Sequence, residues 1–535
     1  MSKRVKNLDA EALPLGNARY QELLKSNEPP LEIERPLIES VVSRLRDRLS
    51  SHDEKISRSG LRTRLKRRTE ERESLATDLA RNAVILSPLR RLPPEILFEI
   101  FSFTLPFDWE VKARGSSLDV KESPWLLTRI CSRWRTVALA SSSFWTFIVI
   151  DDDAWSGRST SLVSLLQLQL DRTRTSPLRV HFETSNSHSR RHAPLFDLLA
   201  ERSRQWVKAH LVLTPELFPT LATIRNRIPL LRTLWFQSSD NPDLSQTLVG
   251  DHIDCFLAAP ALQAACIILE ESLPSVLLPA HQLTHYQLAA AWQMHVDILK
   301  IATNLLEARI YITEDSLHAV PPQIIELLNL RLLAVTHVGI LDFLTVPALR
   351  QLDLVSASEL DINWSNEFDA AHYIDSMVSR SSCVIEKLVA YGDGPIVDLV
   401  VAVLSRNQSI VEFMATFTAE STEEANTLIS SLARQDTEGV FNLAPQLEAV
   451  SFGVTDDGTV DYDLFHDMLA SRWAVPRCGL RSGGLLISVD AAGTPGAQAI
   501  RHRMDDLRKT GLDVLFVAGS EADHILCQWL LGISA

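Results

Sequence analysis

The sequence lacks the short motifs by which many enzymes are recognised. Glycine is scarce, with 19 in a chain of 535 residues, and no G-x-x-x-x-G-K-[ST], G-x-G-x-x-G, G-x-S-x-G or H-E-x-x-H pattern occurs. Phosphate-cradling loops, nucleophile elbows and zinc-protease helices each need one of these patterns. The 15 histidines show no metal-ligand clustering. We therefore expect a chain that is not an enzyme and that needs no metal and no cofactor.

Two further absences concern the cellular compartment. No stretch approaches the ~18 uninterrupted apolar residues of a membrane span, and the N-terminus lacks the apolar core of a secretory signal. No two cysteines form a C-x-x-C pair, and none has a histidine at zinc-finger spacing; the six lie at 131, 255, 266, 383, 478 and 527. Such cysteines are typical of reduced, buried thiols. We expect a soluble protein of the cytoplasm, the nucleus or both, with no membrane partner.

The length and the charge distribution indicate how many structural units the chain has and which kind of partner its charge disfavours. A chain of 535 residues exceeds the ~250–300 at which one hydrophobic core stops growing, so we expect two or three structural units. The formal net charge is −14, but residues 1–91 hold 20 Lys and Arg against 14 Asp and Glu. The remainder of the chain is therefore strongly acidic, which argues against nucleic acid as a partner.

The first 82 residues divide into two segments. Residues 1–35 are polar, contain "SNEPP", and predict a disordered lead-in. Residues 36–82 show heptad-like spacing in two blocks with a break near Gly60; the apolar positions are Ile38, Val42, Leu45, Leu49, Ile56, Leu61, Leu65, Leu75 and Leu79. The break indicates either a turn between antiparallel helices or a stutter in one helix. The segment could lie on the protein as an amphipathic helix or form a coiled coil, within the chain or with a second chain.

The strongest local pattern spans residues 87–150. In "LPPEIL" the prolines predict a helix start, because the N–H that proline lacks would be unpaired in the first turn anyway. Glu95 suits the positive end of that helix dipole. A broad apolar stripe follows, and after a polar stretch at 106–123 "WLLTRICSRWRTVALAS" predicts a second amphipathic helix. The apolar surface is too wide for so small a unit to bury alone.

This segment resembles the F-box, and the wider arrangement is similar to the large F-box families of mushroom-forming (basidiomycete) fungi. The resemblance covers roughly 60 residues and rests on Leu92-Pro93, Glu95-Ile96-Leu97, Ile100-Phe101, Ile130-Cys131, Trp134-Arg135 and Trp145. One departure is the stretch of about 20 residues, Pro106–Ser123, between the two helices. We expect it to be a surface insertion.

The resemblance implies a task. An F-box docks on a Skp-type adaptor, which joins it to a cullin–RING ubiquitin ligase, while the rest of the chain holds a protein substrate. The residues carried over as adaptor contacts are Leu92, Pro93, Ile96, Leu97, Ile100, Phe101, Ile130, Cys131 and Trp134. One alternative for these residues is that they form the core of an ordinary helical bundle. The alternative for the chain is an interaction scaffold, independent of ubiquitin, that uses its repeats and helical N-terminus. Whether the helical segment at 36–80 covers this surface discriminates between the two.

Apolar triplets of the form apolar-x-x-apolar-x-apolar recur in the segment from 160 to 535. They begin at residues 231, 262, 283, 305, 327, 349, 385, 410 and 447. Five of the eight steps fall within the 20–29 residues of a leucine-rich repeat, although the asparagine that closes such repeats is mostly missing. The whole sequence therefore predicts a mixed α and α/β chain. It has an N-terminal helical segment, a small three-helix domain, and an irregular leucine-rich-repeat-like α/β solenoid for substrate recognition.

Overall fold

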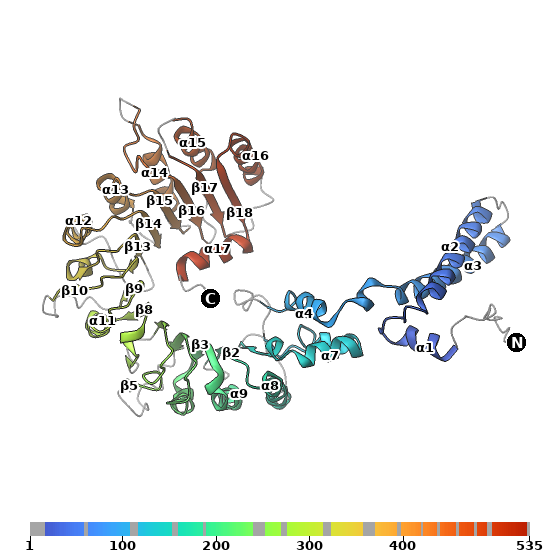
Figure 1. Cartoon of the computed structure of the whole chain (residues 1–535). Helices are drawn as coiled ribbons and strands as arrows, with labels where there is room; N and C mark the ends of the chain where they lie inside the picture. Colours follow the sequence, from blue (N-terminus) through green and yellow to red (C-terminus); the bar gives the residue numbers. More distant parts are fainter. Residues whose placement is uncertain are drawn as a thin grey trace. The chain divides into compact units, whose positions relative to one another are not determined.

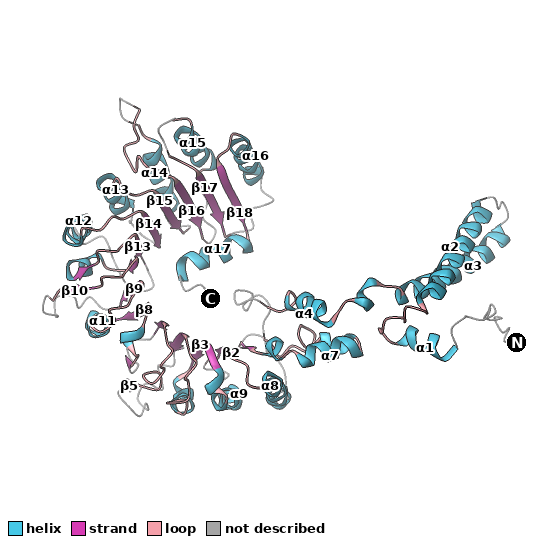
Figure 2. Ribbon diagram, viewed as in Figure 1, coloured by secondary structure: helices cyan, strands magenta, loops and turns pink. Residues whose placement is uncertain are grey.

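The computed structural model describes fifteen segments of the chain. They are residues 17–57, 62–106, 116–151, 159–185, 189–238, 252–268, 275–313, 323–356, 370–392, 397–418, 421–435, 439–455, 460–475, 479–488 and 495–531. The chain divides into two compact units: unit 1 is residues 1–147 with 164–176, and unit 2 is residues 148–163 with 177–535. Figures 1 and 2 show that unit 1 is helical and that unit 2 contains the strands. The chain is therefore a mixed α/β protein.

Unit 1 begins with three helices, α1 (Asn17–Lys25), α2 (Arg35–Ser57) and α3 (Arg62–Ile85), of which α2 and α3 lie side by side (Figure 1). Ile38 and Val42, near the start of α2, share a buried cluster with Ile85 at the end of α3. At the other end, Arg72 of α3 forms an ion pair with Asp53 of α2 at 2.5 Å. The two helices are therefore antiparallel, as one of the two interpretations of the heptad break predicted. Gly60 itself lies outside the described residues.

The expectation of a disordered lead-in is wrong for residues 17–35. Tyr20 and Leu23 of α1 are buried, and the Tyr20 hydroxyl donates to Asn82 Oδ1 on α3 at 2.7 Å. Arg19 donates to the Glu34 carboxylate at 3.1 Å, and that carboxylate also accepts from the Leu31 amide. The apolar residues of α1 were too few for the sequence to indicate a packed helix. The rest of the expected lead-in, residues 1–16, lies outside the described segments.

The remainder of unit 1 packs around one hydrophobic core. Its elements are η1 (Pro88–Arg91), α4 (Pro94–Ser102), α6 (Leu127–Ile130), α7 (Ser132–Ala140), η3 (Ser142–Trp145) and the C-terminal part of α8 (Ser159–Thr173). The buried core residues are Leu97, Phe101, Trp125, Leu127, Val137, Ala138, Phe144 and Trp145. At this core the rings of Trp125 and Trp145 meet edge to face, 5.0 Å apart.

Two features of this core were not expected from the sequence. Arg172 of α8 lies over Trp125 and Trp145, 4.6 and 4.2 Å from the ring centroids, so the end of α8 completes unit 1. The end of the expected surface insertion also contributes. Leu118 is buried, and the Trp125 indole N–H donates to the Ser117 carbonyl at 3.0 Å. The polar composition of 106–123 hid this contact; residues 107–115 are not among those described.

Unit 2 is built on a fourteen-stranded sheet whose strands follow one another in chain order. Every strand pairing recorded from β2 to β18 is parallel. The strands are β1 (Phe147–Ile150), β2 (Leu178–Glu183), β3 (Trp206–Leu213), β4 (Thr233–Ser238), β6 (Ala264–Ile268), β8 (His285–Ala290), β9 (Glu307–Ile312), β11 (Leu332–Val335), β13 (Gln351–Ser356), β14 (Lys387–Gly392), β15 (Glu412–Phe417), β16 (Ala449–Val454), β17 (Ser482–Ile487) and β18 (Asp513–Ala518). Two short parallel ladders lie in the segments that connect strands of this sheet. They pair β5 (His252–Ile253) with β7 (Ser275–Val276) and β10 (Ile325–Glu326) with β12 (Leu344–Thr345).

Helices follow the strands. They are α9 (Ser189–Glu201), α10 (Phe218–Ala222), α11 (Trp292–Leu299), α12 (Ala370–Ser381), α13 (Val397–Arg406), α14 (Thr422–Ala433), α15 (Tyr462–Trp473), α16 (Pro495–Lys509) and α17 (Ser520–Leu531). Parallel strands in chain order have right-handed crossovers, which places the connecting helices on one face. The last helix, α17, lies on the other face of the sheet. A Cβ on Gly483 would meet Leu469 of α15, whereas a Cβ on Gly453 would meet Leu526 of α17. We call the face that α17 covers the inner face.

The apolar triplets occupy equivalent positions in this sheet. Leu231, Leu234 and Phe236 are fully buried, and the strand pairing carries the pattern from β4 to β16. One triplet was placed wrongly in the sequence. Ala308 pairs with Leu333 and Ile310 with Val335, so the repeat in β11 is Leu330-Leu333-Val335 rather than Leu327-Leu330-Leu332. The run "LLNLRLLAV" fits the template in both frames, and only the pairing separates them.

Candidate functional site

Helix α4 starts where the prolines predict it. Pro93 is the N-cap, with φ −56° and ψ 152°, and Pro94 is the first helical residue. Glu95 lies in the first turn, where a carboxylate favours the helix dipole. α7 starts differently, because the Cys131 sulfur caps it by accepting from the Trp134 amide at 3.4 Å. The proline at the start of α4 and the cap at Cys131 set where each helix begins, and the helical period then decides which side chains share a side.

The two helices bury part of their apolar surface against each other. Leu97 and Phe101 of α4 are each 1% exposed. The Phe101 ring lies 4.7 Å from the ring of the half-buried Trp134. Leu92 is also half-buried against this core. Leu97 and Phe101 were expected to contact an adaptor; in this structure they offer no surface to a partner, because the core of unit 1 encloses them.

A second set of apolar residues stays exposed on α4 and α6. Ile96, Ile100 and Phe103 follow each other along one side of α4 and are 46%, 41% and 75% exposed. Leu126 and Ile130 of the α6 region are 43% and 45% exposed. The Ser123 hydroxyl donates to Thr104 Oγ1 at 2.9 Å, which holds the end of α4 beside the residues that lead into α6. We call these five residues the apolar docking set.

The structure thus separates the nine residues expected as adaptor contacts. Ile96, Ile100, Ile130 and Pro93 are exposed, Leu92, Cys131 and Trp134 are half-buried, and Leu97 and Phe101 are core. Sequence reasoning missed Phe103, although it lies seven residues after Ile96 and three after Ile100, at helical spacing. It also left out Leu126, and Leu89 of η1, which is 56% exposed.

Two arginines tie the N-terminal helices to the start of α4. Arg90 is 5% exposed, and its guanidinium donates to the Leu23 carbonyl at 2.8 Å. Burial lowers the pKa of Arg90. The Arg133 guanidinium of α7 donates to the carbonyls of Arg90 and Leu92. Because the docking set keeps its exposure, α2 and α3 do not cover it while they are anchored in this way.

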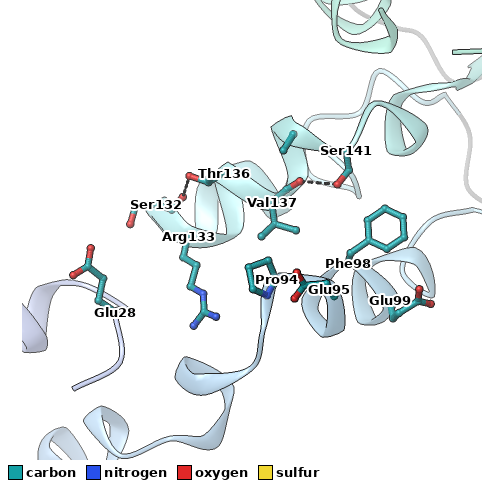
Figure 3. Close-up of a pocket in the computed structure, with 11 residues that line it drawn as sticks. Glu28, Pro94, Glu95, Phe98, Glu99, Ser132, Arg133, Thr136, Val137 and Ser141 are labelled. Carbon is teal, nitrogen blue, oxygen red and sulfur yellow. Dashed lines mark hydrogen bonds between the residues drawn. The ribbon is translucent and has the colours of Figure 1, made fainter. Parts of the chain in front are cut away.

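A groove runs between α4 and α7 on another side of α4. Its volume is about 820 Å³, and Figure 3 shows the residues that line it. α4 contributes Pro94, Glu95, Phe98 and Glu99; α7 and the residue after it contribute Ser132, Arg133, Thr136, Val137, Ala140 and Ser141; Glu28 precedes α2. Phe98 is two residues from both Ile96 and Ile100, and two residues turn a helix by about 200°. The apolar floor of the groove at Phe98 therefore faces a different side of α4 from Ile96 and Ile100, while Glu99 of its rim is a helical neighbour of Ile96 and borders the docking set.

The inner face of unit 2 has its own polar and aromatic features. His181, His210 and Trp235 lie in one row on β2, β3 and β4, with ring centroids 4.2 and 5.1 Å apart along a stack. Further along this row, Arg309 of β9 donates to Asp353 of β13 at 3.4 Å and to the Tyr391 hydroxyl at 3.0 Å.

The Arg309–Asp353 pair is nearly inaccessible to water. Arg309 is 4% and Asp353 1% exposed. Burial raises the pKa of Asp353 to about 6, against the influence of Arg309. Burial would lower the pKa of Arg309, but Tyr391 and Asp353 raise it. The pair bridges β9 and β13 across β11, which lies between them in the sheet.

Within the described segments, no group of three or more His, Cys, Asp or Glu is placed to hold a metal ion. No helix among those residues is both long and apolar enough to cross a membrane. A comparison of the chain with protein-family models gives no match, and a search of curated proteins finds no significant relative. The geometry of the docking set and of the groove is therefore the basis for assigning a function.

Proposed function

We propose that this chain is the substrate-recognition subunit of a Skp–cullin–F-box type ubiquitin ligase. In this proposal, residues 87–150 are an F-box that docks on a Skp-type adaptor through Ile96, Ile100, Phe103, Leu126 and Ile130. Unit 2 is an irregular leucine-rich-repeat-like solenoid that holds a protein for ubiquitination. The chain itself performs no chemistry, because the ligase reaction belongs to its partners.

One observation carries the proposal. Unit 1 has a core of eight buried apolar residues, and it still presents five large apolar side chains at 41–75% exposure on α4 and α6. Three of them share one side of α4, and large exposed apolar patches are uncommon on monomers and mark interaction sites. The residues lie within the motif that resembles the F-box, and aliphatic and aromatic anchors dominate such interfaces.

For unit 2, the proposal is supported by the arrangement of its strands. They succeed one another in chain order, and the apolar triplets take equivalent positions from strand to strand. Repeat proteins of this type bind partners along their inner surface. The row of His181, His210 and Trp235 is the part of that surface where aromatic rings gather.

The test uses exposed residues, so that a loss of binding does not reflect unfolding. The variant Ile96→Asp with Ile100→Asp should lose at least 100-fold in affinity for a co-expressed Skp-type adaptor, because two carboxylates would enter an apolar interface. Ile33→Asp is the matched control, since Ile33 is 79% exposed in the same unit. It should bind as the unchanged chain does. Wild-type binding by the double variant would refute the docking assignment and favour a scaffold independent of ubiquitin.

A further inference from the structure

The groove between α4 and α7 has an apolar floor and walls. Val137 is 8% exposed, and the half-buried Phe98 ring is held in place by stacking on Phe144 at 4.8 Å. Pro94 and Ala140 add aliphatic surface on either side. The floor therefore suits an apolar stripe of a partner.

The Thr136 and Ser141 hydroxyls and the Arg133 guanidinium in the groove are already hydrogen-bonded. The Thr136 hydroxyl donates to the Ser132 carbonyl at 3.0 Å, and the Ser141 hydroxyl donates to the Val137 carbonyl at 2.8 Å (Figure 3). The Arg133 guanidinium is occupied by the carbonyls of Arg90 and Leu92. These groups add little polarity to the wall, and the small side chains at 132, 136 and 140 let a helix approach closely.

The carboxylates at the rim of the groove, unlike these hydrogen-bonded groups, have no cationic partner among the described residues. Glu28, Glu95 and Glu99 are exposed and line the groove, and none of them has an ion pair among the described residues. Glu95 and Glu99 are four residues apart on α4, a spacing at which like charges repel and destabilise a helix. Cations of a partner would relieve this repulsion and complement the rim.

We propose that the α4–α7 groove binds a basic amphipathic helix of a partner protein. The apolar stripe of that helix lies on Phe98 and Val137, and its lysine or arginine side chains pair with Glu28, Glu95 and Glu99. This is the helix-in-groove mode of recognition, with charge selecting the partner. The apolar floor of this site is separate from the adaptor surface, because Phe98 lies about 160° around α4 from Ile96 and from Ile100.

Peptide binding to the full chain tests the proposal. The probe is a fluorescein-labelled synthetic peptide of about 14 residues, ~21 Å long as a helix, with a leucine stripe and lysines four residues apart. Fluorescence anisotropy at low salt should give saturable binding that weakens with salt. A peptide with glutamate in place of every lysine should not bind.

Variants locate the site. Glu95→Gln with Glu99→Gln should weaken binding about tenfold, because two ion pairs at a partly apolar site are lost. Glu70→Gln with Glu73→Gln on α3 is the matched control, since it also removes two exposed carboxylates from one helix. Thr136→Trp should block the groove sterically. Adaptor binding by all three should be unchanged, so that a failure of this proposal remains distinguishable from a failure of the proposed function.

Three outcomes would overturn the proposal. Equal weakening by the α3 control would show that the acidic chain attracts the peptide without a site. Tighter binding after deletion of residues 1–16 would identify the chain's own basic N-terminus, with Lys3, Arg4 and Lys6, as the occupant. A dimer by light scattering that the Thr136→Trp variant dissociates would identify a second copy instead. Tenfold weakening by the α4 pair, with none by the α3 pair, would support the proposal.

Discussion

Alanine at two adjacent positions of α4 should separate the core of unit 1 from its docking surface. Leu97 is 1% exposed within the core cluster, so Leu97→Ala removes buried methyl groups and leaves a cavity. Leucine-to-alanine changes at such sites cost about 2–5 kcal/mol. Ile96 is 46% exposed, and its truncation should cost less than about 1 kcal/mol, because half of its surface is already in water.

The assay is hydrogen exchange of the α4 and α7 amides, combined with adaptor affinity. Loss of about 3 kcal/mol at Leu97 should speed exchange by more than a hundredfold, since each 1.4 kcal/mol is a factor of ten. Ile96→Ala should leave exchange within about fivefold of the unchanged chain and should weaken adaptor binding. Equal effects of the two changes on exchange would refute the division of α4 into a buried and an exposed side.

Three other changes test unit 2. Arg472→Met should destabilise it by about 3–5 kcal/mol in urea unfolding, because the fully buried guanidinium donates to three backbone carbonyls at 2.7–3.0 Å; an effect below about 1 kcal/mol would contradict this. Asp353→Asn should flatten the pH dependence of stability. The Asp353 pKa is raised to about 6 in the folded chain, so its protonated form stabilises the fold at low pH and this contribution is lost as pH rises through 6; identical unfolding profiles of variant and unchanged chain between about pH 4 and 7 would refute it. Gly453→Val should release α17 from the inner face, since a Cβ there would clash with the Leu526 side chain; unchanged exchange in α17 would show that the helix adapts.

Local sequence rules predicted the starts and spacing of elements well. Proline, with glutamate behind it, predicted a helix start at Pro93 or Pro94, and α4 begins at Pro94, because the signal is a property of the first helical turn. Heptad spacing found α2 and α3, since Ile38 and Val42 recur with the period of a helix face. The apolar triplets marked strands of a parallel sheet, because the second and third apolar positions of each triplet are two residues apart, which places them on the same face of a strand.

Long-range packing decided what the sequence left open. Ile96, Leu97, Ile100 and Phe101 are all large and apolar, and only the position of α7 determines which of them are enclosed. Arg172 joins unit 1 through a contact with tryptophans 27 and 47 residues away in the chain. The periodic spacing of apolar residues in the sequence does not predict a contact of this kind. Long-range pairing also explains the misplaced triplet at Leu327. Two frames of the template were equally apolar there, and only the pairing of β11 with β9 shows which one is correct.

The division of α4 into a core side, a docking side and a groove side has a consequence for partner binding. Leu97 and Phe101 hold the helix against α7, and Phe98 of the groove floor lies about 160° around it from Ile96 and from Ile100. One ligand on each side would therefore not collide with the other at α4. Both ligands would also share a helix of only nine residues, Pro94–Ser102, whose ordering either one would favour. If both proposals hold, adaptor and basic peptide should bind together, and each should leave the affinity of the other unchanged or higher. Competition between them in a titration would place the two sites on one surface and contradict the exposures of Ile96 and Phe98.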